Sequence, residues 1–315
     1  MPTKDKKNQC FHEYFAEWME LYKEGGVRPV TYQKYQMTLQ RLSELAPTLT
    51  VSELDRRSYQ KLINEYAKTH ERKTTMDFHH QLKGAILDAL YEGLLEMDPT
   101  RKVIIKGKLP NAKKTKFLSQ HELTALLAQL KLSKALNWDW LILLVAKTGM
   151  RFAEALALTP SDFDFAEQKI RINKTWNYKS VDGGFAETKN TSSRRTLQVD
   201  KLLNSQFKKL VKGLPEDKPI FVKGRVFNST INSRLKTLCK AADVPVISIH
   251  SLRHSHASVL LFAGVSTASI AKRLGHSSVT TTQETYLHII KELENKDTHK
   301  IMKHLSDLHK IAPED

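Results

Sequence analysis

The sequence predicts a mainly α-helical protein with a small antiparallel β-sheet, divided into two domains. Apolar residues recur at helical spacing through most of the chain, and capping residues, glycines and prolines mark where these stretches begin and end. Residues 163–199 instead show short apolar segments separated by polar turns, which predicts the strands. A length of 315 residues is enough for two domains with hydrophobic cores of their own.

The first part of the chain predicts a bundle of about four or five helices. Its first helix carries one apolar stripe, which we interpret as core because aromatic stripes are more often core than ligand sites. The stripe consists of Phe11, Tyr14, Phe15, Trp18 and Leu21. Gly25 and Gly26 should end this helix, Thr31 should cap the next one, and Pro99 should end the last.

A lysine-rich segment separates the two predicted domains. Residues 106–116 read KGKLPNAKKTK and contain five lysines. One interpretation is a solvated flexible tether, and the other is a basic strap whose lysines displace counterions from a nucleic-acid backbone. The predicted organisation is a helical domain at 1–105, this linker at 106–116, a second domain at 117–290 and a helical tail at 291–315.

The second domain begins with clear helix signals. Ser119 and Glu122 form a capping box, and residues 138–147 are so apolar that their helix should be buried. Arg151 follows at the edge of this apolar region, where a positive charge needs an anionic partner. That partner is either Glu154, in an ordinary salt bridge, or a bound phosphate, with Glu154 bracing the helix.

Residues 187–199, ETKNTSSRRTLQV, predict a strand, a polar turn and a second strand. Lys189 lies at the start of that turn, and Lys179 lies in the preceding loop. For a single loop lysine, exposure to solvent is the more common state. Arg194 and Arg195 either bind a DNA backbone or pair with acidic residues, and the sequence does not distinguish the two.

The stretch from Ile249 to His288 carries the densest set of chemically active residues. His250 and Arg253 are three apart, so they share one helix face. Gly275 is expected just past the end of a second helix, which places His276 beyond that end. Tyr286 is the only tyrosine after Tyr178. The neighbouring His254 and His256 are interpreted as residues that pack or bond the backbone.

These residues resemble the tyrosine recombinase family, the integrases of phages and mobile elements. The family carries a His-x-x-Arg box, here at 250–253, a Leu-Gly-His box, here at 274–276, and a tyrosine that in this chain follows His276 by ten residues. The run from Arg151 to Leu158 matches the family's first arginine box, and the run from Thr188 to Arg195 its lysine hairpin. The resemblance implies these catalytic residues: Arg151, Lys189, His250, Arg253, His276 and Tyr286 as nucleophile.

The implied reaction is site-specific DNA recombination, for integration or excision, through a 3′-phosphotyrosyl intermediate. It uses no metal, other cofactor or ATP, because arginines neutralise the phosphate and the phosphotyrosyl bond conserves the phosphodiester energy. Lys189 would protonate the leaving oxygen and His276 would donate to the phosphate. His250 would either accept the tyrosine proton or bond the phosphate.

The resemblance also implies partners. These are double-stranded DNA at attachment or core sites and a homo-tetramer on two duplexes, with DNA-bending or directionality proteins as further candidates. The first domain would be the core-binding domain that clamps DNA, the second the catalytic domain, and the tail could pack on its own or a neighbouring protomer. Because the helices begin near residue 11, we expect that the arm-binding domain of many integrases is absent or has been trimmed away.

Composition agrees with this interpretation. The formal net charge is +16, which favours a polyanionic partner over a basic surface kept only for solubility. The two cysteines form no metal or disulfide pattern, the N-terminus does not look like a signal peptide, and no apolar run is long enough to span a bilayer. We therefore expect a cytoplasmic, nucleoid-associated protein of a bacterial host.

Two other functions compete. A zinc hydrolase could use His250, His254 and His256, but Ser251 stands where the HExxH motif needs glutamate. A non-catalytic DNA-binding regulator on the same fold is the stronger alternative. We would expect such a regulator to have lost one of the six catalytic residues, and all six are present.

Overall fold

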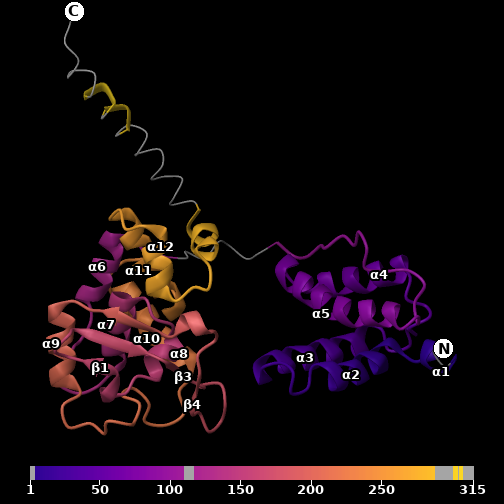
Figure 1. Cartoon of the computed structure of the whole chain (residues 1–315), viewed down its shortest axis with the longest axis horizontal. Coiled ribbons are helices and arrows are strands. Elements are labelled where there is room, and N and C mark those ends of the chain that lie inside the picture. The colour runs from indigo at the N-terminus through magenta and orange to yellow at the C-terminus, as the bar shows by residue number, and fades with distance from the viewer. Residues whose placement is uncertain (1–3, 110–116, 288–300, 304, 308–315) are drawn as a thin grey trace, which may run out of the picture. The chain divides into compact units, whose positions relative to one another are not determined.

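The computed structural model describes residues 4–109, 117–287, 301–303 and 305–307. The chain divides into two compact units, Met1–Lys113 and Lys114–Asp315, here called unit 1 and unit 2, and each has its own hydrophobic core (Figure 1). The predicted fold class, mainly α with small antiparallel sheets, is confirmed. The predicted helical tail at 291–315 lies outside the described residues, apart from 301–303 and 305–307, which are helical.

Unit 1 is a helical bundle. Its helices are α1 (Lys4–Asn8), α2 (Phe11–Tyr22), α3 (Pro29–Leu45), α4 (Arg56–Ala67) and α5 (Arg72–Tyr91). Helix α2 packs on α3 and α5, and α4 packs on α5 (Figure 1). Aromatic rings fill much of the core, with Phe15 stacked on Trp18 at 5.7 Å and Tyr66 on Phe78 at 4.0 Å between ring centroids.

Three details of unit 1 differ from the prediction. Leu21 is 74% exposed, because it lies at the edge of the stripe in the last turn of α2. Helix α3 begins at Pro29 rather than after Thr31, since proline suits the first helical position, where an N–H would have no partner in the helix. Helix α5 ends at Tyr91, well before Pro99.

The start of the basic segment lies against unit 1. The Lys108 N–H donates to the carbonyl of His70 at 2.8 Å. Gly107 approaches the backbone so closely that an added Cβ would lie 2.2 Å from the amide nitrogen of Arg72. A larger residue cannot replace this glycine without moving the chain. Residues 110–116 of the segment lie outside the described part.

Unit 2 surrounds its core with helices and carries two small sheets. The helices are α6 (Gln120–Ala128), α7 (Trp138–Thr148), α8 (Phe152–Leu156), η1 (Pro160–Asp162), η2 (Thr191–Ser193), α9 (Lys201–Leu210), α10 (Asn228–Ala241), α11 (Ile249–Phe262) and α12 (Thr267–Leu274). Helix α11 packs on α6, α7, α10 and α12. The capping box of Ser119 and Glu122 and the burial of α7 are confirmed.

The strands do not form the predicted simple hairpin at 187–199. One sheet has the order β1 (Phe163–Asp164), β2 (Lys169–Ile172), β5 (Arg195–Gln198), and the other pairs β3 (Lys174–Trp176) with β4 (Phe185–Glu187), all antiparallel. The strands before and after Lys189, β4 and β5, therefore pair with different partners. Residues 188–194 belong to neither sheet. They connect Glu187, which pairs with Lys174, to Arg195, which pairs with Ile172.

Within the described residues, no helix has both the length and the apolar character needed to cross a membrane.

Candidate active site

Arg151 is placed by the sharp corner between α7 and α8. Gly149 ends α7 in the left-handed region at φ 68°, and a Cβ there would lie 2.6 Å from the His256 ring, so the corner requires glycine. Arg151 is the N-cap of α8, and its backbone N–H donates to Glu154 at 2.8 Å. Its guanidinium donates to the Glu154 carboxylate at 2.8 Å and to the Gly275 carbonyl at 3.2 Å.

Glu154 holds a second arginine. It is 1% exposed, and it accepts two hydrogen bonds from Arg195 at 2.9 and 3.2 Å. Burial alone would raise the pKa of the Glu154 carboxyl, but the charges of Arg195 and Arg151 outweigh it and hold this pKa below its usual range. Arg195 thus pairs with an acidic residue, one of the two roles that the sequence left open, whereas the exposed Arg194 lies 3.7 Å from Glu187.

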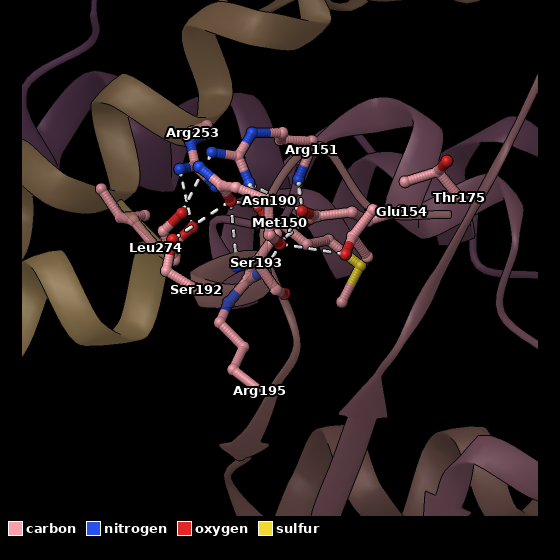
Figure 2. A network of polar contacts seen from close by, with 12 residues as sticks. Met150, Arg151, Glu154, Thr175, Asn190, Ser192, Ser193, Arg195, Arg253 and Leu274 are labelled. Carbon is pink, nitrogen blue, oxygen red and sulfur yellow. Dashed lines mark hydrogen bonds and ion pairs between the residues drawn. The ribbon is translucent and has the colours of Figure 1, made fainter. Parts of the chain in front are cut away.

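Arg253 is the most deeply buried cation of the cluster, with 3% of its surface exposed. From α11 it donates to the carbonyls of Gly149 at 2.8 Å and Leu274 at 2.7 Å. Burial, followed by the charge of Arg151, lowers the pKa of its guanidinium. Figure 2 shows the guanidinium groups of Arg151 and Arg253 beside each other, fixed by these contacts.

The cluster carries more positive than negative charge. Within the network drawn in Figure 2, Arg151 and Arg195 bond the Glu154 carboxylate, and the nearby Arg253 bonds only backbone carbonyls, so one carboxylate stands against three arginines. Buried cations in excess of their counter-charges favour an anionic ligand. The planar forks of two arginines are well suited to the oxygens of a phosphate group.

Lys189 is exposed in the segment between β4 and β5. It directly precedes a turn that is hydrogen-bonded to Arg151. The Asn190 side chain accepts from the Ser193 backbone at 3.2 Å and from its hydroxyl, and Arg151 donates to that hydroxyl at 3.3 Å. Asn190 and Ser193 thus link the turn that follows Lys189 to Arg151; Figure 2 shows these three linked residues, Asn190, Ser193 and Arg151.

His276 lies just beyond α12, as predicted. Gly275 adopts the left-handed conformation at φ 69°, and the His276 N–H bonds the Ala271 carbonyl at 3.0 Å. The Nδ1 atom of His276 is hydrogen-bonded to the Thr282 hydroxyl at 2.7 Å. Burial, with the charges of Arg253 and Arg151, lowers the pKa of His276 to about 4, so its imidazole is neutral at pH 7.

Tyr286 lies on the helix of residues 279–287, on the same face as Thr282. It is 2% exposed and packs against Ala257, Leu261 and Leu274. Its hydroxyl is hydrogen-bonded to Nδ1 of His254 at 3.0 Å. Burial raises the pKa of Tyr286 to about 12, although the charge of Arg253 acts in the opposite direction.

His250 is exposed in the first turn of α11, one turn before His254, and their rings meet edge to face at 5.1 Å. Although part of the residue is open to solvent, its ring is partly desolvated, and this effect, followed by the charges of Arg253 and Arg151, lowers the pKa of His250. Direct contacts link Arg151, Arg253, His276 and Tyr286 to neighbouring parts of one site, whereas His250 and Lys189 lie at its exposed edge.

Two residues of the site were not identified from the sequence. His254 was interpreted as a packing residue, yet it bonds Tyr286; Thr282, which bonds His276, was not singled out. The one available signal for His254 was its position next to Arg253 and four residues after His250. His256 does have the predicted structural role, since its ring nitrogens meet the Ala146 carbonyl and Arg273, both at 2.9 Å.

The contacts of His256 also bear on the zinc alternative. Both of its ring nitrogens are occupied, so it cannot join His250 and His254 around a metal ion without losing them. In the part of the chain that the structure describes, no group of three or more His, Cys, Asp or Glu is arranged as a metal site.

Comparisons with known proteins agree with this geometry. Residues 116–292 match the family model described as the phage integrase family. The integrase of Staphylococcus phage L54a is 24% identical over 96% of this chain and 95% of its own length. The ICEBs1 integrase of Bacillus subtilis (strain 168) is 30% identical over 64% of this chain and 57% of its own length.

Solved structures share the fold. The integrase of transposon Tn1549, in complex with a circular intermediate DNA, superposes with a TM-score of 0.74 at 17% identity, covering 87% of this chain and 94% of that one. A lambda integrase dimer bound to a core site gives 0.65 at 15% identity, covering 89% and 78%.

A helical unit that brings two arginines, a histidine and a buried tyrosine together is the arrangement expected of a tyrosine recombinase. Since the family model spans more than half of the sequence, the chain belongs to the phage integrase family.

Proposed function

We propose that this chain is the integrase of a phage or mobile element and that it cuts and rejoins DNA through Tyr286. The observation that carries the proposal is the arginine cluster, in which Arg151 and Arg253 are held in place by backbone carbonyls and Glu154. Such preorganised donors stabilise charge that develops in a transition state without reorganising.

In the proposed reaction, the Tyr286 oxygen attacks phosphorus and the bond to the 5′ oxygen breaks, which leaves a 3′-phosphotyrosyl link. Arg151 and Arg253 bind the non-bridging oxygens. When Nδ1 of His276 accepts from Thr282, its Nε2 carries a proton and can donate to the phosphate. Lys189 protonates the leaving oxygen, and His250 bonds the phosphate from the exposed edge of the site.

The wider assembly is also part of the proposal. We assign unit 1 to the clamp on DNA, and residues 106–116 to a basic strap between the units, because the chain carries a formal net charge of +16. The acting form would be a homo-tetramer on two duplexes at an attachment site, aided by DNA-bending or directionality proteins, in the cytoplasm of a bacterial host. The Tn1549 and lambda integrases were solved bound to DNA, which supports the DNA partner.

A suicide-substrate assay tests the function. The protein is incubated, with EDTA present, with nicked duplex DNA carrying the end of the element that encodes it, and run on a denaturing gel. Wild type should give a covalent protein–DNA band, and Tyr286→Phe should abolish it, because phenylalanine has no attacking oxygen.

The other outcomes are equally informative. A band that survives in Tyr286→Phe would place the nucleophile elsewhere. A wild-type protein that shifts this DNA in a native gel and never forms the band would be a binding regulator, which would contradict the proposal.

A further inference from the structure

The hydroxyl of Tyr286 is buried away from water, and a titratable side chain lies next to it. Tyr286 is 2% exposed, so its proton cannot pass directly to bulk solvent. The group at hydrogen-bonding distance is Nδ1 of His254, 3.0 Å away, on the helix that also carries Arg253. The two rings lie 5.8 Å apart between centroids.

His250 is in a different position. It is exposed, and it touches the edge of the His254 ring rather than the tyrosine hydroxyl. The resemblance left two roles open for His250, acceptance of the tyrosine proton or a bond to the phosphate. Because His254, and not His250, contacts the hydroxyl, the two roles can fall to two different histidines. His254 would accept the proton, and His250, one helical turn away, would bond the phosphate.

We propose that His254 is a further catalytic residue, which orients the hydroxyl of Tyr286 through Nδ1 and accepts its proton during the attack. The inference rests on the proposed function. As the bond from the Tyr286 oxygen to phosphorus forms, the O–H proton moves to Nδ1 of His254, which becomes an imidazolium. The bond from phosphorus to the 5′ oxygen breaks, and that oxygen takes its proton from Lys189. In rejoining, both protons return.

The physical need for an acceptor follows from burial. A phenolate formed in advance at this position would be costly, because burial raises the pKa of Tyr286 to about 12. Transfer of the proton to an adjacent imidazole during the attack avoids that free ion. A positioned base of this kind contributes about 10²–10⁴-fold to a rate.

The first test compares single-turnover adduct formation by wild type, His254→Ala, His254→Asn and His121→Ala on the nicked element-end DNA. Asparagine retains a hydrogen-bonding group near the position of Nδ1 but is not a base. His121 is an exposed histidine of the same unit, on α6, and serves as the matched control. Both His254 variants should be slower by about 10²-fold or more, with His121→Ala unchanged.

The second test separates the base from the acid. Fluorinated tyrosine at position 286, which ionises more readily, should restore most of the rate lost in His254→Ala and little of that lost in Lys189→Ala. A substrate with sulfur in place of the 5′ bridging oxygen should do the reverse, because a thiolate leaves without a proton. A native gel shift and thermal unfolding check that each variant still folds and binds.

The outcomes distinguish this inference from the proposed function. If wild type forms the adduct and His254→Ala forms it at the same rate, His254 has no catalytic role. If His254→Asn keeps the full rate, His254 only orients the hydroxyl and the proton transfer is wrong. Rescue of His254→Ala by the sulfur substrate would place His254 at the leaving group. Absence of any wild-type adduct would instead count against the proposed function.

Discussion

The two units bury apolar side chains in similar ways but differ in the charge that they bury. Among the described residues, the buried polar side chains of unit 1 are Thr38, Thr75, His79 and Thr100, none of them an acid, a lysine or an arginine. Unit 2 buries Asp139, Glu154, Asp162 and Arg253 as well as His256. Burial of an ion costs about several kcal/mol of desolvation free energy, and its partners or a ligand must offset that cost.

Not all the buried charge of unit 2 belongs to the site. Asp139 accepts two bonds from Arg234, at 2.8 and 2.7 Å, and Asp162 pairs with Lys174 at 2.5 Å. These pairs match one cation to one anion. The Glu154 cluster, where we propose that phosphate binds, instead has several cations for one carboxylate.

The largest effect is expected when that single carboxylate is removed. Glu154→Gln leaves the buried Arg195 guanidinium without its counter-charge, which should lower the free energy of unfolding by about 3–5 kcal/mol. The same acid-to-amide change in unit 1 is Asp88→Asn. Asp88 is half-buried and accepts from the Trp18 indole at 2.6 Å, and asparagine keeps an acceptor there, so the loss should be about 1 kcal/mol or less.

Urea unfolding followed by far-UV circular dichroism measures both variants. Equal losses for Glu154→Gln and Asp88→Asn would mean that the cluster is no more charge-dependent than an ordinary hydrogen bond, and the contrast between the units would disappear.

Lowering the pH should have a smaller effect on the free energy of unfolding, and it should destabilise both units. Burial lowers the pKa of His256 in unit 2 to about 3 and that of His79 in unit 1 to about 4. Each neutral histidine contributes fully to stability above the unfolded-state pKa of about 6.5. As the pH falls toward the pKa of the folded state, this contribution is lost, because the unfolded chain then binds more protons than the folded one. For His256 the loss at pH 5 should be about 2 kcal/mol.

The measurement is urea unfolding at pH 7 and pH 5. Trp18→Phe leaves tryptophans only at 138, 140 and 176, so that fluorescence reports on unit 2. The difference between the two pH values should shrink in His256→Gln. An unchanged difference would show that His256 is not kept neutral by the fold.

The same comparison explains what the sequence could predict. Local signals predicted the helix ends, such as the capping box at Ser119 and the left-handed Gly275, because these depend on a few neighbouring residues. Simple spacing failed at residues 188–194, where pairing of β4 and β5 with different strands is a long-range property. The bond of His254 to Tyr286 spans 32 residues, and neither the motif spacing nor helix periodicity indicates it.

The smallest effect is expected when one buried hydroxyl is removed, and the same substitution can be made in both units. Thr282→Val and Thr38→Val each remove a buried hydroxyl, bonded to His276 at 2.7 Å in unit 2 and to Gln81 at 2.6 Å in unit 1. Each should lower the free energy of unfolding by about 1 kcal/mol.

Their effects on catalysis should differ. Only Thr282→Val should also slow adduct formation, by about tenfold, because the His276 ring loses the partner that fixes its tautomer, and a partner of this kind is worth roughly 1.4 kcal/mol or more where the chemistry depends on it. Unfolding curves and single-turnover cleavage of the same nicked DNA give both quantities. If both variants cleave as fast as wild type, Thr282 contributes only to stability, and His276 keeps its orientation through the αL turn at Gly275 alone.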